Sequence, residues 1–144
     1  MTPTALLVDD DAAGLRALAE WVRREGLVVR TAGTLEEARA CLEAPPDVVL
    51  IDLDLPDGMG LELLDDLRAL PDTDVVVITG QGSIKSAVEA MRGGAVDYLT
   101  KPIDLPRLRR ILQNVSRSAD LSSEIDALRG ELRNLGRFGE MQGA

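Results

Sequence analysis

The chain has 144 residues and a formal net charge of −9; 45% of its residues are hydrophobic, only 2% are aromatic, and it contains no histidine. This length suits one domain with at most a short appendage, and aliphatic side chains must build its core. Without histidine, a Ser-His-Asp triad, a histidine-ligated metal and a phosphohistidine relay are excluded. The single cysteine, Cys41, excludes a disulfide framework within the chain, and we interpret it as a small buried hydrophobe.

Charge is spread unevenly. Residues 1–104 hold 9 basic and 20 acidic side chains, whereas residues 105–144 hold 7 and 5. The acidic body argues against direct contact with a nucleic-acid backbone. No apolar run approaches the roughly 20 residues of a membrane span, and the N-terminus has no signal-peptide pattern. We therefore expect a cytoplasmic protein that binds neither nucleic acid nor membrane through this segment.

Aliphatic runs predict five strands, each followed by a pattern of helical spacing. Residues 48–51 form the clearest run, typical of a buried strand in a parallel sheet, and it ends at Asp52. The other predicted strands cover residues 4–8, 27–31, 75–79 and 95–100. Helices are predicted over residues 15–22, from Thr34 to before Pro45, over 61–67 and 83–92, and from 105 onward. Thr34 and Glu37 predict a capping box, and residues 55–60 a loop.

Five strand–helix alternations with short connections predict an α/β fold with helices on both faces of a parallel sheet. The flavodoxin-like order 2-1-3-4-5 is the doubly wound arrangement for five strands. This order places the first strand beside the third, so the acidic residues that follow each of them should converge.

Polar residues follow four of the predicted strands: Asp9 and Asp10, Asp52, Thr79 and Lys101. Three carboxylates placed together repel one another, and Mg²⁺ is a natural counterion because it prefers oxygen ligands. A metal, a lysine and a hydroxyl around a carboxylate suit phosphoryl transfer, with Asp52 as the nucleophile that becomes an aspartyl phosphate. Taken singly, the same residues have ordinary alternatives: a solvated turn, a helix cap and a surface charge.

Together these residues resemble the receiver domain of two-component response regulators, over about residues 4–118. The motifs that carry the resemblance are LLVDD at 6–10, DVVLIDLDLP at 47–56, VITG at 77–80 and DYLTKP at 97–102.

The resemblance implies a role for each matching residue. Asp52 would accept a phosphoryl group from a sensor histidine kinase. Asp10 would bind Mg²⁺ directly, Asp9 through water, and Asp52 and the backbone carbonyl of Asp54 would complete the protein ligands. Lys101 would bridge to the phosphoryl group through a segment whose Lys101–Pro102 bond is cis.

The resemblance also implies a switch and a tuning pair. Thr79 would move to the phosphoryl oxygen, and Tyr98 would swing inward behind it. Asp54 and Gln81 occupy positions that influence dephosphorylation. The sequence departs from many receivers at Met59, where an acidic residue is common, and we expect little consequence.

The C-terminal segment carries two apolar stripes. The first, at Leu108, Leu112, Val115 and Ala119, predicts a helix packed on the sheet. The second is an a/d seam of about two heptads, which extends backward through Ile111. Its residues are Leu121, Ile125, Leu128, Leu132 and Leu135. We predict a coiled-coil linker over 119–136 that pairs two copies of the chain; a helix that folds back on its own domain is the alternative.

Residues 137–144, RFGEMQGA, resemble the opening of the AAA+ ATPase domain of sigma-54-dependent (NtrC-type) transcription activators. The predicted organisation is a receiver domain over 1–118, the linker, and the start of that ATPase. Nothing in the chain resembles a P-loop, so we expect no enzyme activity from it. Phosphorylation of Asp52 would change dimerisation through the last helix and linker and thereby control the ATPase. Two alternatives are a Mg²⁺-dependent phosphohydrolase with an aspartyl-phosphate intermediate, and a stand-alone receiver that acts by protein contacts.

Overall fold

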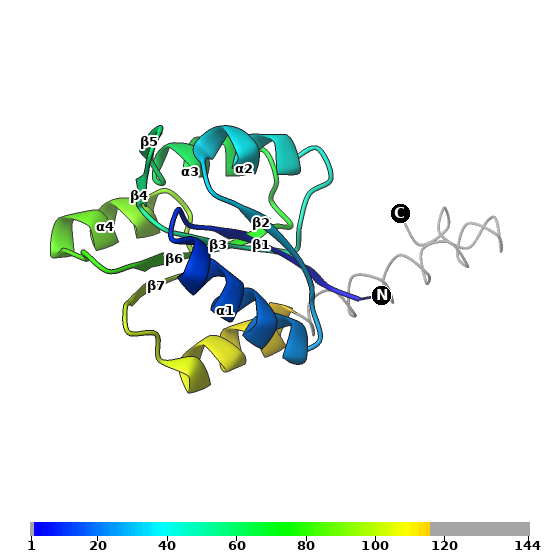
Figure 1. Cartoon of the computed structure of the whole chain (residues 1–144). Coiled ribbons are helices and arrows are strands. Elements are labelled where there is room, and N and C mark those ends of the chain that lie inside the picture. The colour runs from blue at the N-terminus through cyan, green and yellow to red at the C-terminus, as the bar shows by residue number, and fades with distance from the viewer. Residues whose placement is uncertain (1, 116–144) are drawn as a thin grey trace, which may run out of the picture.

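A computed structural model describes residues 2–115, in which a parallel sheet lies between two layers of helices (Figure 1). The sheet contains β1 (Thr4–Val8), β2 (Val28–Ala32), β3 (Val48–Ile51), β6 (Asp74–Thr79) and β7 (Asp97–Thr100). All neighbouring pairs are parallel, in the order β2-β1-β3-β6-β7. The predicted flavodoxin-like topology is therefore confirmed, and β1 lies beside β3 as the order requires.

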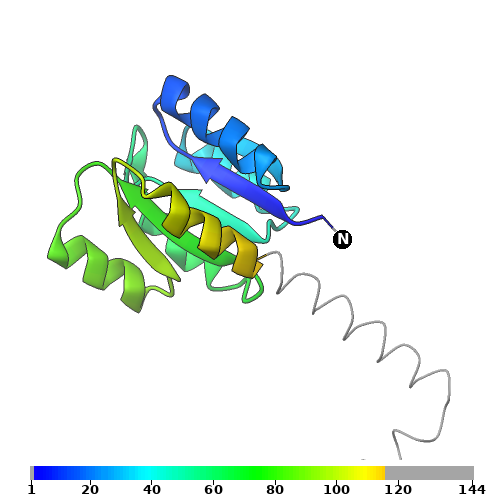
Figure 2. The same cartoon turned by 90° about the horizontal axis from the view of Figure 1, so that it is seen from below.

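Helices cover both faces of the sheet. They are α1 (Ala12–Arg24), α2 (Leu35–Cys41), α3 (Glu62–Leu67), α4 (Ile84–Arg92) and a last helix that is described over residues 105–115. The last helix and α1 lie side by side on one face, and α2 and α3 lie on the other (Figures 1 and 2). The helices on both faces leave the interior strands almost completely buried, and the whole of β3 is buried.

Each face of the sheet has its own apolar cluster. The first cluster joins β1, β3 and β6 to α2, α3 and α4, and Leu6, Leu35 and Leu63 are among its fully buried members. The second joins the other side of the same strands to α1 and the last helix, with Leu7 and Leu50 at its centre. Alternate residues of one strand enter opposite clusters, as the two-residue period of a strand dictates.

The last helix packs on the second cluster through one stripe. Leu108, Leu112 and Val115 are at most 3% exposed, as the first predicted stripe requires. Ile111 is half-buried and packs against the same cluster, so within the described residues it serves the domain's own core. The other seam residues, the linker over 119–136 and the segment 137–144 lie outside the described residues. Of the helices described, none is both long enough and apolar enough to cross a membrane.

The start of α2 differs in one contact from its predicted capping box. Thr34 Oγ1 accepts a hydrogen bond from Glu37 N at 3.1 Å, as expected for an N-cap. The Glu37 carboxylate accepts from Gly33 N at 2.9 Å. The glutamate therefore secures the residue before the cap, and only half of the box forms.

A short hairpin replaces the predicted loop after β3. Its strands are β4 (Asp54–Leu55) and β5 (Gly58–Met59), which pair antiparallel. Strands of two residues have no periodicity that a sequence pattern can reveal, so Pro and Gly dominated the prediction. The turn needs a glycine, since Gly58 has φ +153° and a Cβ there would meet Glu62 and Leu35 side chains at 2.4 and 2.8 Å.

Candidate functional site

Asp52 is held where β3 ends. Its backbone N–H donates to Val8 O at 2.9 Å, which extends the pairing with β1 by one residue. Its side chain stays near the sheet, with the whole residue only 8% exposed, and its Oδ1 accepts from Asp54 N at 3.1 Å. A carboxylate buried to this degree needs hydrogen bonds or a cation.

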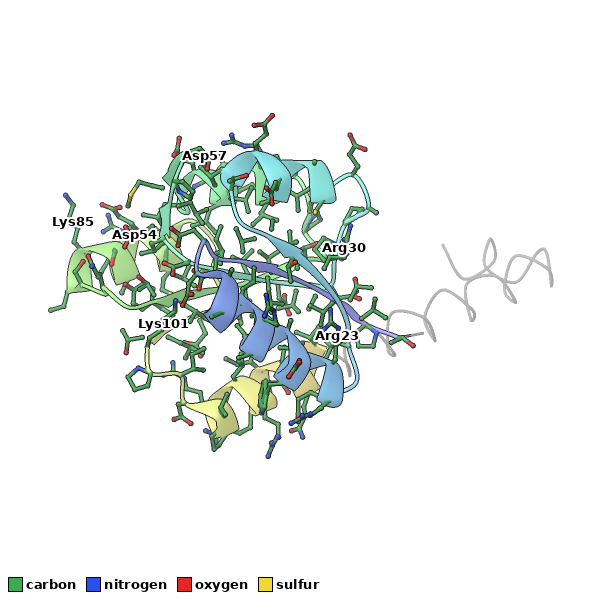
Figure 3. The ribbon with its side chains drawn as sticks, viewed as in Figure 1. Arg23, Arg30, Asp54, Asp57, Lys85 and Lys101 are labelled. Atoms are coloured by element: carbon green, nitrogen blue, oxygen red, sulfur yellow. The ribbon has the colours of Figure 1, made fainter. Side chains whose placement is uncertain are left out.

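Lys101 supplies the cation. Its Nζ lies 3.0 Å from Asp52 Oδ2 and 2.8 Å from Asp9 Oδ2, so one ammonium group joins residues that follow β7, β3 and β1. Partial burial lowers the pKa of Lys101, but the hydrogen bonds to Asp9 and Asp52 outweigh it, and the net pKa lies above the ordinary lysine value. Figure 3 shows Lys101 and Asp54 at the same end of the sheet.

The acidic pair after β1 is split. Asp9 Oδ1 accepts from Asp11 N at 3.0 Å, and Asp9 N donates to Ala32 O at 3.1 Å, so Asp9 is fixed beside the lysine. Asp10 is exposed. Sequence reasoning placed Asp9, Asp10 and Asp52 together; the structure joins Asp9 and Asp52 through Lys101 and leaves the Asp10 side chain exposed.

The oxygen groups at this edge suit a hard cation. Within residues 2–115, no three acidic or cysteine side chains stand together as a ready metal site. The two carboxylates that do meet share the Lys101 ammonium, so their mutual repulsion is already relieved. Two carboxylates beside the solvent edge match the one or two that Mg²⁺ uses when it keeps several waters, and the donor set therefore fits this metal.

Thr79 ends β6, the strand next to β3. It is 0% exposed, and its Oγ1 accepts from Gln81 N at 3.2 Å. Gln81 itself is exposed. The hydroxyl caps the turn after the strand, and its own proton can serve a second partner at the edge of the site.

Tyr98 points toward the start of α4. Its hydroxyl lies 2.7 Å from Ser86 Oγ, and Ser83 N donates to it at 3.4 Å. Ser83 and Ser86 form a complete capping box at the first turn of α4. Sequence reasoning missed Ser86 as the partner of Tyr98, although the spacing Ser83-x-x-Ser86 at a helix start could have indicated the box.

A cavity of about 370 Å³ lies beside these groups, between α1 and the segment after Lys101. Asp9, Asp11, Asp52 and Lys101 form its polar lining, and aliphatic side chains such as Leu15, Leu18, Ile78 and Ile103 form the rest. The Lys101–Pro102 peptide bond is cis, as predicted.

Two residues of the loop after β3 were not predicted to matter for the site. Gly60 lies so close to the chain after β3 that a Cβ there would stand 2.2 Å from Asp52 O. Asp57 accepts hydrogen bonds from Leu35 N and Glu36 N, the first backbone groups of α2. A glycine in a loop can indicate a place where a side chain does not fit, and that signal could have identified Gly60. Asp57 offers no such local signal, because its partner Leu35 lies 22 residues away in the sequence.

Residues 5–113 match the profile of the response regulator receiver domain. The match covers most of the chain, and the chain belongs to this family: it contains the receiver domain of a two-component response regulator. Receiver domains are regulatory phosphoacceptor domains that histidine kinases phosphorylate.

Two relatives illustrate the family. The chain is 46% identical over 101 residues to the photosynthetic apparatus regulatory protein RegA of Cereibacter sphaeroides, with 69% of this chain and 55% of RegA covered. It is 39% identical over 122 residues to the response regulator protein PilR of Pseudomonas aeruginosa, with 83% of this chain and 27% of PilR covered. The chain therefore spans about half of one relative and about a quarter of the other.

Solved structures share the fold. The receiver domain of a Luxo repressor protein from Vibrio parahaemolyticus has a TM-score of 0.78 at 29% identity, with 87% of this chain and 98% of that chain covered. A Burkholderia pseudomallei response regulator with a phosphorylated aspartic acid and a calcium ion has a TM-score of 0.71 at 32% identity, covering 88% and 74%. The beryllofluoride-activated NtrC4 receiver dimer has a TM-score of 0.73 at 33% identity, covering 79% and 96%.

Proposed function

We propose that Asp52 is the phosphoacceptor of this receiver domain and that a sensor histidine kinase supplies its phosphoryl group. The observation that carries the proposal is the Lys101 ammonium, which holds the Asp52 and Asp9 carboxylates together at the ends of three strands. The phosphorylated aspartic acid in the Burkholderia pseudomallei relative supports it.

In the proposed reaction a carboxylate oxygen of Asp52 attacks the phosphorus atom, and the bond from phosphorus to the donor's leaving group breaks. Lys101 keeps its charge throughout, because its raised pKa holds the ammonium protonated, and it neutralises oxygens of the transferred group. Mg²⁺, when bound by Asp9, Asp10, Asp52 and the backbone carbonyl of Asp54, would supply further positive charge for the same oxygens.

The readout would begin at Thr79 and Tyr98. Thr79 is buried at the end of β6, next to β3, and its Oγ1 accepts from Gln81 N. Its own proton would be the one that it donates to a phosphoryl oxygen after moving toward Asp52. Tyr98 would then move inward, which requires it to leave Ser86 and the start of α4. The side chains of Asp54 and Gln81 are both exposed at the site's edge, and we assign them to tuning of dephosphorylation.

The finer context follows from the sequence. We propose that residues 1–118 form the receiver and that residues 137–144 begin an AAA+ ATPase of a sigma-54-dependent activator. Two copies would pair through the seam of residues 119–136 and through the last helix, where Ile111 is only half-buried. Two comparisons support this proposed organisation. The match to PilR covers 83% of this chain, and the similar NtrC4 receiver domain is a dimer. Phosphorylation would alter the pairing and so control the ATPase.

Phosphorylation is tested by incubating the chain with Mg²⁺ and a small phosphoramidate donor and measuring its intact mass. One added phosphoryl group is expected, with none in Asp52→Ala and none when a chelator removes Mg²⁺. Asp66→Asn is the matched control, because Asp66 is an exposed acid that pairs with Arg39 away from the site, and it should still gain the group. An equal gain in Asp52→Ala contradicts the assignment.

Pairing is tested separately on the 144-residue chain with beryllofluoride and Mg²⁺, by light scattering. A change in mass or, for a constitutive dimer, in the small-angle scattering profile is expected in the wild type and absent from Asp52→Ala. An identical mass and profile with and without beryllofluoride contradicts the proposed control through dimerisation but leaves phosphorylation untouched.

A further inference from the structure

The side chain of Asp57 ties the β4–β5 hairpin to a different part of the fold. Its Oδ1 accepts from Leu35 N at 2.8 Å and its Oδ2 from Glu36 N at 3.1 Å. Both donors lie in the first turn of α2, where backbone N–H groups have no partner within the helix. The Leu35 N–H is the main reason why the pKa of Asp57 lies below its ordinary value. Figure 3 shows Asp57 on the α2 and α3 side of the molecule.

Outside contacts determine where this hairpin lies. A two-stranded hairpin is marginally stable alone, and each of these strands has only two residues. Glu62 Oε2 accepts from Met59 N at 2.7 Å, and Gly60 N donates to Leu53 O at 2.7 Å. These contacts hold the second strand and the base of the hairpin, and the Asp57 carboxylate links its turn to the start of α2.

The hairpin in turn contacts the phosphoacceptor. Asp54 is the first residue of β4 and pairs with Met59, and its N–H donates to Asp52 Oδ1 at 3.1 Å. The same peptide segment carries the Asp54 carbonyl. A displacement of the hairpin therefore moves both the donor that orients Asp52 and the carbonyl beside it.

We propose that Asp57 is a positioning residue for phosphorylation: it clamps the β4–β5 hairpin to the start of α2 and thereby fixes the Asp54 peptide against the Asp52 carboxylate. This inference rests on the proposed function of Asp52. Asp57 itself lies five residues beyond Asp52 and acts through Asp54.

The test compares Asp57→Ala and Asp57→Asn with the wild type and with Asp66→Asn. Asp66 is the matched control, because it is also an exposed acid that joins α2 to its neighbour, through a 2.8 Å ion pair with Arg39, and within residues 2–115 it makes no hydrogen bond to the hairpin. For each protein we would measure the rate of phosphorylation by phosphoramidate, the Mg²⁺ dissociation constant by calorimetry, and the amide resonance of Asp54. All measurements are made at a temperature at which circular dichroism shows every variant folded.

Asp57→Ala should slow phosphorylation and weaken Mg²⁺ binding by about tenfold, the usual effect of removing a group that orients a ligand. Asp57→Asn keeps one of the two acceptor oxygens and should lose less than Asp57→Ala. Both should shift the Asp54 amide resonance, and Asp66→Asn should change none of the three.

Wild-type rate, affinity and Asp54 resonance in Asp57→Ala would overturn the inference. So would equal losses in Asp57→Ala and Asp66→Asn, because they would indicate general loosening of the helix layer. Failure of the proposed function is distinguishable, since the wild type itself would then gain no phosphoryl group at Asp52.

Discussion

Replacing Gly60 with alanine should damage the site through the backbone alone. A Cβ at this position would stand 2.2 Å from Asp52 O and 3.0 Å from both Asp52 C and Leu53 Cα, whereas ordinary contacts begin near 3.4 Å. Because all three atoms belong to the main chain, no side chain can rotate away, and the chain must separate by about 1 Å. Overpacking of this kind costs about 1–3 kcal/mol of unfolding free energy.

The same displacement should also slow phosphorylation. A misplacement of about 1 Å at a reacting group costs on the order of a hundredfold in rate. The assay pairs urea unfolding with the phosphoramidate reaction, followed by intact mass. Gly80→Ala is the control, since its Cβ would meet only Lys101 Cδ at 3.8 Å, and it should behave as the wild type. A Gly60→Ala protein with wild-type unfolding and rate would refute this steric account.

Three further predictions concern single contacts. Lys101→Met should lower stability by a nearly constant amount from neutral pH up to the ordinary lysine pKa. Because the folded pKa of Lys101 is raised, the wild-type advantage should then be lost as the pH rises through the folded pKa, which urea unfolding over this pH range checks. Asp74→Asn should stabilise the folded domain at neutral pH by up to about 1 kcal/mol after solvent screening, because burial, and then repulsion from Asp47, raise the Asp74 pKa. The gain should vanish in acid, where the carboxyl is protonated. Thermal unfolding at both pH values checks this. Ser86→Ala should cost about 0.5–1.5 kcal/mol and be strongly non-additive with Tyr98→Phe in a double-mutant cycle, because both remove the same 2.7 Å hydrogen bond; additive losses would contradict it.

The strands that position the site were predictable because their signal is local. The aliphatic run at 48–51 and the residue after it depend on nothing elsewhere in the chain, and the alternation with helices then dictates the sheet order. The convergence of Asp9, Asp52 and Lys101 followed from that order, since parallel strands end at one edge.

The contacts that orient the site were not predictable, because their partners are distant or too short for a pattern. Asp57 pairs with a helix start 22 residues earlier, and the hairpin that carries it has two-residue strands. Asp10 follows Asp9 directly in the sequence, yet it is exposed, whereas the Asp9 side chain is fixed by Lys101, and sequence alone does not separate the two environments. The Glu37 carboxylate accepts from the N–H of Gly33 rather than from that of Thr34, because a flexible side chain can reach more than one nearby donor.

The lysine bridge also sets an order for the appearance of the site during synthesis. Lys101 lies 92 residues from Asp9 and 49 from Asp52 along the chain. Until the segment after β7 has left the ribosome, the two acids at the ends of β1 and β3 have no ammonium between them. Such distant pairings form late because closing the chain over long separations is slow. A nascent chain that ends before residue 101 therefore cannot neutralise the two acids in this way, and the site that we propose for phosphorylation is complete only once the sheet is complete.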